Sequence, residues 1–133
     1  MRIENRVSLW LGNALDPETL DEYVRLRYSE DGDIIPSRLM TDFGIEAYDE
    51  NFREAEVLPV ASSRLQEIFA GFSYEKQITD AYESAFGSEL DSKCNAVILL
   101  FNYDATIPAG QTAVSDGLSL RYYGAVAYEP SYA

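Results

Sequence analysis

Residues 95–103 read Asn-Ala-Val-Ile-Leu-Leu-Phe-Asn-Tyr, and this stretch decides the fold. Six apolar residues in succession lie between Asn95 and Asn102. An uninterrupted apolar run of this length is typical of a strand that is buried on both faces. We therefore expect residues 95–103 to form a central strand of a β-sheet.

Two further segments have strand-like patterns. Residues 120–128 alternate between apolar and other side chains, and residues 7–11 read Val-Ser-Leu-Trp-Leu before a predicted turn at Gly12-Asn13. Residues 104–119 are rich in Gly, Pro, Ser, Thr and Asp, which indicates a loop. We expect the strands at 95–103 and 120–128 to form an antiparallel pair joined by this long loop.

Two helices are predicted in the first third of the chain. Asp16-Pro17 combines an N-cap residue with a proline at the first helical position. Pro36-Ser37 begins a shorter helical stretch that includes Phe43 and ends at Gly44, a residue suited to the left-handed conformation after a helix.

Two more helices follow an imperfectly alternating segment, residues 52–58, which predicts a strand. Ser63 is the expected cap of a helix at residues 64–70, and Ser73 that of a longer helix at residues 74–86. The longer helix has one apolar stripe, which indicates packing on the core. The stripe consists of Ile78, Ala81, Tyr82, Ala85 and Phe86.

The mixed order of strands and helices favours an α+β fold. We expect a mixed or antiparallel sheet of about four strands, packed against a single layer of helices. The chain has 133 residues, a length typical of one domain, so residues 1–133 are predicted to form a single domain.

Net charge restricts the partners of this protein. The sequence has 23 acidic and 10 basic residues, a formal charge of −13, and no histidine. Such a chain repels phosphate backbones and anionic lipids, so we expect it to bind neither nucleic acid nor membranes. The charge favours a basic protein partner, although many acidic proteins are acidic only for solubility.

The residues that commonly perform catalysis or bind cofactors are scarce. Without histidine, the usual triads and the commonest general base near neutral pH are excluded. Glycines are scattered, and Asp31-Gly32-Asp33 lacks the remaining ligands of a calcium loop. We therefore expect no catalytic residue, no cofactor and no metal, while a carboxylate-dependent enzyme stays open as the alternative.

The single cysteine and the N-terminus indicate the compartment. Cys94 cannot form an intrachain disulfide and begins the buried strand pattern, so it is expected to be a small core residue. The first residues do not have the pattern of an export signal, and no apolar run is long enough to span a bilayer. We expect a cytoplasmic protein, and the oligomeric state is left open.

Acidic residues are concentrated in residues 30–56. This segment has nine carboxylates against Arg38 and Arg53, so its net charge is −7. Aromatic residues lie among the carboxylates, a mixture suited to attracting a cationic partner and then packing against it. The alternative is a solvated face with core aromatics.

We therefore nominate a partner-binding set from this segment, with Asp42, Asp49, Glu50 and Glu54 steering the partner and Tyr48 and Phe52 anchoring it. The complete set is Glu30, Asp31, Asp33, Asp42, Glu46, Tyr48, Asp49, Glu50, Phe52, Glu54 and Glu56.

Several short motifs resemble those of a known family. They are Val7-Ser-Leu-Trp-Leu-Gly-Asn13, Leu20-Asp-Glu-Tyr23, Glu30-Asp-Gly-Asp-Ile-Ile-Pro-Ser37, and Asp42-Phe-Gly-Ile45 followed by Tyr48-Asp-Glu-Asn-Phe52. This pattern, mainly in the first 60 residues, resembles the immunity protein 22 family of bacterial polymorphic toxin systems.

The resemblance implies a cytoplasmic protein that binds a cognate toxin and blocks it, a role that requires no catalytic residue. Nuclease toxins fit the acidic charge, because their substrate channels are basic. The resemblance supplies no functional residues, so the partner-binding set depends on charge and aromatic placement. A carboxylate-dependent enzyme and an acidic regulatory or scaffold domain are the alternatives.

Overall fold

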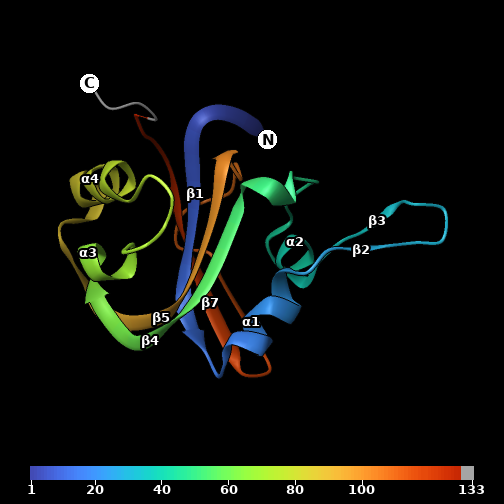
Figure 1. Ribbon diagram of the computed structural model, residues 1–133, viewed down its shortest axis with the longest axis horizontal. Helices are drawn as coiled ribbons and strands as arrows, with labels where there is room; N and C mark the ends of the chain where they lie inside the picture. Colours follow the sequence, from blue (N-terminus) through green and yellow to red (C-terminus); the bar gives the residue numbers. More distant parts are fainter. Residues whose placement is uncertain (130–133) are drawn as a thin grey trace.

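A computed structural model describes residues 1–129. In these residues, five strands form one sheet in the order β4-β5-β1-β7-β6, and every neighbouring pair is antiparallel (Figure 1). The strands are β1 (Arg2–Ala14), β4 (Arg53–Arg64), β5 (Glu89–Tyr103), β6 (Thr112–Ser115) and β7 (Leu118–Ala127). The predicted α+β class is confirmed.

Helices and a small hairpin complete the architecture. The helices are α1 (Pro17–Val24), α2 (Arg38–Phe43), α3 (Leu65–Ile68), α4 (Glu75–Phe86) and the short 3₁₀-helix η1 (Glu50–Phe52). A two-stranded sheet formed by β2 (Arg27–Tyr28) and β3 (Ile34–Ile35) lies apart from the main sheet. Among residues 1–129, no helix is long and apolar enough to cross a membrane.

The apolar run of β5 is interior, as predicted. β5 pairs with β4 on one side and with β1 on the other, and residues 96–101 are at most 5% exposed. Ala96, Ile98 and Leu100 belong to one core cluster, whereas Val97, Leu99 and Phe101 belong to a second on the opposite face. The middle position of the sheet is occupied by β1.

The expected single layer of helices is wrong. α1 and α2 cover one face of the sheet, and α3 and α4 cover the other (Figure 1). Leu20 and Phe43 pack in the first cluster, and Ile68 and Tyr82 in the second. Because the side chains of β5 are apolar on both faces, each face must be covered.

The expected antiparallel pair of residues 95–103 and 120–128 is also wrong, because β1 lies between β5 and β7. The loop predicted at 104–119 includes the short strand β6.

The turn predicted at Gly12-Asn13 does not form, because both residues continue β1 and lie opposite Leu120 and Ser119 of β7. A Cβ atom at Gly12 would overlap the carbonyl oxygen of Ser119. The close approach of two strands therefore explains this glycine better than a turn does.

The first two helices begin as predicted, and the second also ends as predicted, whereas the helical spacing expected to reach Arg27 stops at Val24. The Thr19 amide donates to Asp16 Oδ1 at 2.8 Å and caps α1, while the Met40 amide donates to Ser37 Oγ at 3.3 Å and caps α2. Gly44 follows α2 with φ 63°, a left-handed conformation that glycine adopts readily.

The last two helices differ from their predicted starts. α3 is shorter than predicted, and Arg64, which has no side-chain capping bond, occupies the N-cap in place of Ser63. Tyr74, at φ 54°, occupies the N-cap of α4 in place of Ser73. The apolar stripe of α4 buries Ile78 and Tyr82, whereas its last members, Ala85 and Phe86, are exposed.

Candidate partner-binding surface

Residues 27–35, which we call the arm, form a hairpin that projects from the body of the protein (Figure 1). Its turn is closed by the Ser29 amide, which donates to the Asp33 carbonyl at 2.8 Å, and by the Gly32 amide, which donates to the Ser29 carbonyl at 3.0 Å. Gly32 has φ 85°, a conformation that favours glycine. The turn places Glu30, Asp31 and Asp33 at the tip of the arm.

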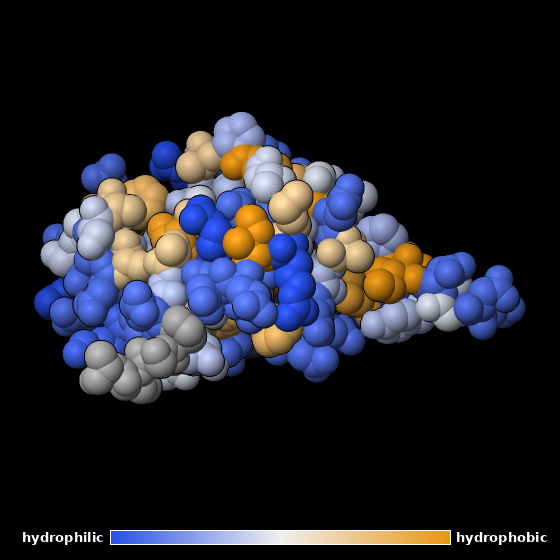
Figure 2. Space-filling view, turned by 90° about the horizontal axis from the view of Figure 1, so that it is seen from above, coloured by the Kyte–Doolittle hydropathy of each residue, from blue (hydrophilic) through white to orange (hydrophobic). Residues whose placement is uncertain are grey.

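The stem of the arm exposes large apolar side chains. Tyr28 is 54% exposed, Ile34 41% and Ile35 47%. Figure 2 shows hydrophobic surface on the stem and hydrophilic surface at the tip. A two-stranded hairpin is only marginally stable in water, and apolar side chains gathered on an exposed element mark an interaction site. The arm therefore has the composition of a binding element.

One hydrogen bond joins the arm to η1. The Tyr28 hydroxyl donates to Glu50 Oε1 at 3.3 Å. The negative charge of Glu50 raises the pKa of the Tyr28 phenol above its ordinary value. Asp49 lies beside Glu50 and caps η1, because its Oδ1 accepts from the Asn51 amide at 2.9 Å.

Five of the predicted partner-binding residues are thus connected through the arm. We call residues 27–35 together with Asp49 and Glu50 the arm surface. The five predicted members are Glu30, Asp31, Asp33, Asp49 and Glu50.

Asp42 lies on α2 and is engaged in packing. Its Oδ2 accepts from the Tyr23 hydroxyl at 2.9 Å, and its Oδ1 accepts from Arg38 Nε at 3.3 Å. Burial, and then the hydrogen bond to Asp42, raise the pKa of the Tyr23 phenol. The Asp42 carboxylate therefore helps to join α1 and α2.

Tyr48 belongs to the core, where we had expected an exposed anchor. It is 9% exposed, and its ring meets that of Tyr103 edge-on with centroids 6.2 Å apart. Arg53 Nη1 donates to the Tyr48 hydroxyl at 3.0 Å and to the Val24 carbonyl at 2.9 Å. The Tyr48 hydroxyl also donates to the Val24 carbonyl at 3.5 Å, so the buried ring keeps its polar group hydrogen-bonded.

Phe52 and Glu46 occupy the neighbouring surface. Phe52 is half-buried, and the Arg2 guanidinium lies 5.5 Å from the centre of its ring. Glu46 is exposed, and its carbonyl accepts from the Tyr103 hydroxyl at 3.3 Å. A cavity of about 230 Å³ is lined by Tyr48, Asp49 and Phe52 among others, so it brings these three predicted residues together.

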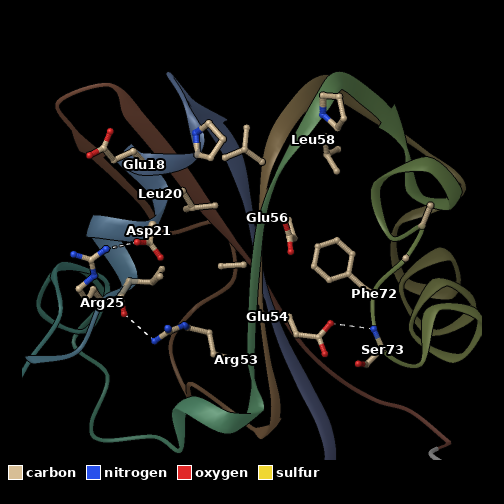
Figure 3. Close-up of a pocket in the computed structure, with 17 residues that line it drawn as sticks. Glu18, Leu20, Asp21, Arg25, Arg53, Glu54, Glu56, Leu58, Phe72 and Ser73 are labelled. Atoms are coloured by element: carbon tan, nitrogen blue, oxygen red, sulfur yellow. Dashed lines mark hydrogen bonds and ion pairs between the residues drawn. The ribbon is translucent and has the colours of Figure 1, made fainter.

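Glu54 and Glu56 lie away from the arm surface, on β4. They line a groove of about 1110 Å³ that follows this strand between α1 and residues 70–73 (Figure 3). The Ser73 amide donates to Glu54 Oε1 at 3.0 Å, whereas Glu56 is exposed. The predicted set therefore divides between the arm surface, the neighbouring surface of Glu46 and Phe52, and the groove, while Asp42 and Tyr48 are held in the packing between helices and core.

The apolar residues of the arm are not among the partner-binding residues predicted from the sequence. The sequence did contain a signal for an exposed apolar hairpin. A glycine-containing turn in an otherwise polar stretch is flanked by Tyr28, Ile34 and Ile35. Two-residue strands are too short for an alternating pattern to be recognised.

The next features are the potential metal ligands and the single cysteine. Within residues 1–129, no three His, Cys, Asp or Glu side chains are grouped so that they could hold a metal ion. Cys94 is buried, and burial raises the pKa of its thiol to about 11. The thiol is therefore protonated at neutral pH.

Comparison with known proteins gave one match. A family model described as Immunity protein 22 matches residues 7–129, nearly the whole chain. Neither the curated proteins nor the solved structures gave a match.

Proposed function

We propose that this protein binds a cognate bacterial toxin in the cytoplasm and neutralises it, because the chain belongs to the Immunity protein 22 family. The role requires a surface that blocks the toxin and no catalytic residue. We assign this surface to the arm and to the carboxylates connected with it.

The assignment of the toxin-binding surface to the arm rests on the composition of the arm. Three exposed apolar side chains on its stem can be buried against a partner, and three carboxylates at its tip can meet a basic surface. Binding energy in protein interfaces is concentrated in a few buried anchors surrounded by polar residues. Ile34, Ile35 and Tyr28 take the place of the anchors first assigned to Tyr48 and Phe52.

The charge of the whole chain favours a basic toxin. With a formal charge of −13, the protein attracts cationic surfaces over distances of about one Debye length, roughly 8 Å at physiological salt. A nuclease fits best, because its cleft must be basic to hold a phosphate backbone, and an acidic arm can occupy that cleft. The carboxylates at the tip would then lie where the phosphates bind.

The experiment uses a toxin domain encoded beside this gene. We expect the purified protein to bind that domain and to inhibit its activity, and its expression to rescue cells that produce the toxin. Replacing Ile34 and Ile35 by serine should raise the Kd for the toxin about 30-fold and weaken rescue, while leaving the fold intact. An unchanged Kd in this variant would remove the arm from the binding surface, and failure of the wild-type protein to bind would refute the proposed function.

A further inference from the structure

β4 is an edge strand whose outer side faces the groove. On its inner side, Arg53 to Val57 pair with Leu100 to Ala96 of β5. Within the part of the chain that the structure describes, no strand pairs with the outer side. The Arg53 amide already donates to the Glu50 carbonyl and closes η1. The other outward backbone amides and carbonyls can pair with another chain, as the free side of an edge strand commonly does.

The groove has the form that an additional strand needs. α1 forms one wall and residues 70–73 form the other, so the two helix layers leave the edge of the sheet between them uncovered (Figure 3). The usable edge runs from Arg53 to Leu58, because Pro59 has no amide hydrogen and the pairing with β5 shifts register after Val57. Six residues of an extended segment would span about 20 Å.

The side chains around the edge favour a basic occupant. The groove is lined by four carboxylates and two guanidinium groups. Both guanidinium groups are engaged: Arg25 pairs with Asp21 and Glu22, and Arg53 donates to the Val24 carbonyl. Of the four carboxylates, Asp21 is paired with Arg25. Glu18, Glu54 and Glu56 therefore leave the groove with more negative charge than Arg53 supplies positive charge.

The same charges disfavour a second copy of this chain. If β4 paired with β4 of another copy, Glu54 and Glu56 would come close to identical carboxylates, and like charges in neighbouring strands destabilise a sheet. Each copy also carries a formal charge of −13. The carboxylates thus repel the protein itself and attract an extended basic segment.

We propose that β4 accepts an extended basic segment of the toxin as a sixth strand of the sheet, along residues 53–58. This inference rests on the proposed function and adds a second contact, separate from the arm surface. Ala55 and Val57 pack toward α1, whereas Glu54 and Glu56 lie on the opposite face of β4, the side of Leu58 and its cluster. The segment should therefore alternate apolar and cationic side chains.

The test begins with a probe that does not depend on the toxin, a six-residue peptide of alternating lysine and valine blocked at both ends. We expect it to slow hydrogen exchange of the outward amides of residues 53–58 in the ¹⁵N-labelled protein. Two matched peptides are controls: one has glutamate in place of lysine, and one carries N-methyl groups on alternate amides, which keep the charge but prevent strand pairing. Neither should protect these amides.

Variants of the protein give a second readout. Glu54→Lys with Glu56→Lys should weaken binding of the lysine peptide about tenfold, whereas Asp80→Lys on α4 should leave it nearly unchanged. Ala70→Trp should fill the groove and prevent protection, and Ala85→Trp on the exposed end of α4 is its control. Equal binding of the N-methylated peptide, no binding of the lysine peptide, or protection only in the arm would overturn the proposal.

The toxin itself completes the test. In the complex, residues 53–58 should be protected from exchange, and Ala70→Trp should weaken binding at least tenfold. Binding without protection of β4 would overturn the inference and leave the proposed function intact. Absence of any complex would refute the proposed function, and the peptide experiment would still report whether the edge accepts a strand.

Discussion

The hydroxyl of Tyr28 lies 3.3 Å from Oε1 of Glu50, and this contact connects a projecting hairpin with the short helix before the edge strand. Through it, the carboxylates at the arm tip and those of η1 belong to one surface, although about 20 positions of sequence separate them.

Replacing Ile34 and Ile35 by serine should weaken toxin binding by about 2 kcal/mol or more, which corresponds to about a 30-fold higher Kd. Both side chains are exposed, so the free energy of unfolding should change by less than about 0.5 kcal/mol. Titration calorimetry and urea unfolding measure the two quantities. Val114→Ser, at a position 79% exposed on β6, is the matched control and should leave both unchanged.

Asp31→Lys combined with Glu50→Lys should slow association with the toxin and reduce its dependence on salt. Asp49 is spared, because it caps η1 and its replacement would disturb that helix. Stopped-flow kinetics between about 50 and 500 mM salt measure the effect. Asp80→Lys on α4 makes half the change in net charge at a distance from the arm surface, and an equal slowing in that variant would show that total charge acts instead of position.

Tyr48→Ala should destabilise the fold by about 3 kcal/mol or more, because it removes a buried ring that packs on Tyr103. Tyr48→Phe keeps the ring and should cost only about 1 kcal/mol, the value of the hydrogen bond from Arg53. Urea unfolding gives both values. If Tyr48→Phe binds toxin tenfold more weakly at unchanged stability, the hydroxyl reaches the partner and the placement of Tyr48 outside the interface is wrong.

The stability of the protein should fall as the pH rises from about 9 to about 11. Burial raises the pKa of Cys94 from 9.0 to about 11 and raises those of Tyr82 and Tyr103 above their ordinary values. The unfolded chain therefore releases these protons at lower pH than the folded chain, and alkali favours unfolding. Urea unfolding at pH 7, 9 and 10 measures the loss, and Cys94→Ala should remove only the part that belongs to the thiol.

Local signals predicted the elements better than their arrangement. Features that act over a few residues were predicted correctly in three places. These are the helix starts at Asp16 and Ser37 and the buried apolar run of β5. The order of the strands depends on pairing between distant segments, so the position of β1 between β5 and β7 was missed. The turn predicted at Gly12 was wrong for the same reason, because this glycine is required by the close approach of the distant Ser119 carbonyl.

The charge pattern predicted part of the candidate surface, but the sequence did not reveal the shape of that surface. The concentration of carboxylates in residues 30–56 pointed to the arm tip and to β4, but not to the groove that follows β4 between α1 and residues 70–73. Aromatic residues in an acidic segment suggested anchors, yet Tyr48 is buried by contacts with Arg53 and Tyr103, which no local pattern reveals. The single-domain prediction and the partner-binding set stay predictions.

The middle position of β1 has a consequence for synthesis. β1 (Arg2–Ala14) is synthesised before both of its neighbours, and the second of them, β7, is complete only at Ala127. Until then, the apolar residues of β1 and half of its backbone groups are unpaired. Sheets closed by such distant segments fold in about milliseconds to seconds, and their incomplete forms aggregate readily. A chain cut before Leu118 lacks β7 and should therefore aggregate when it is expressed.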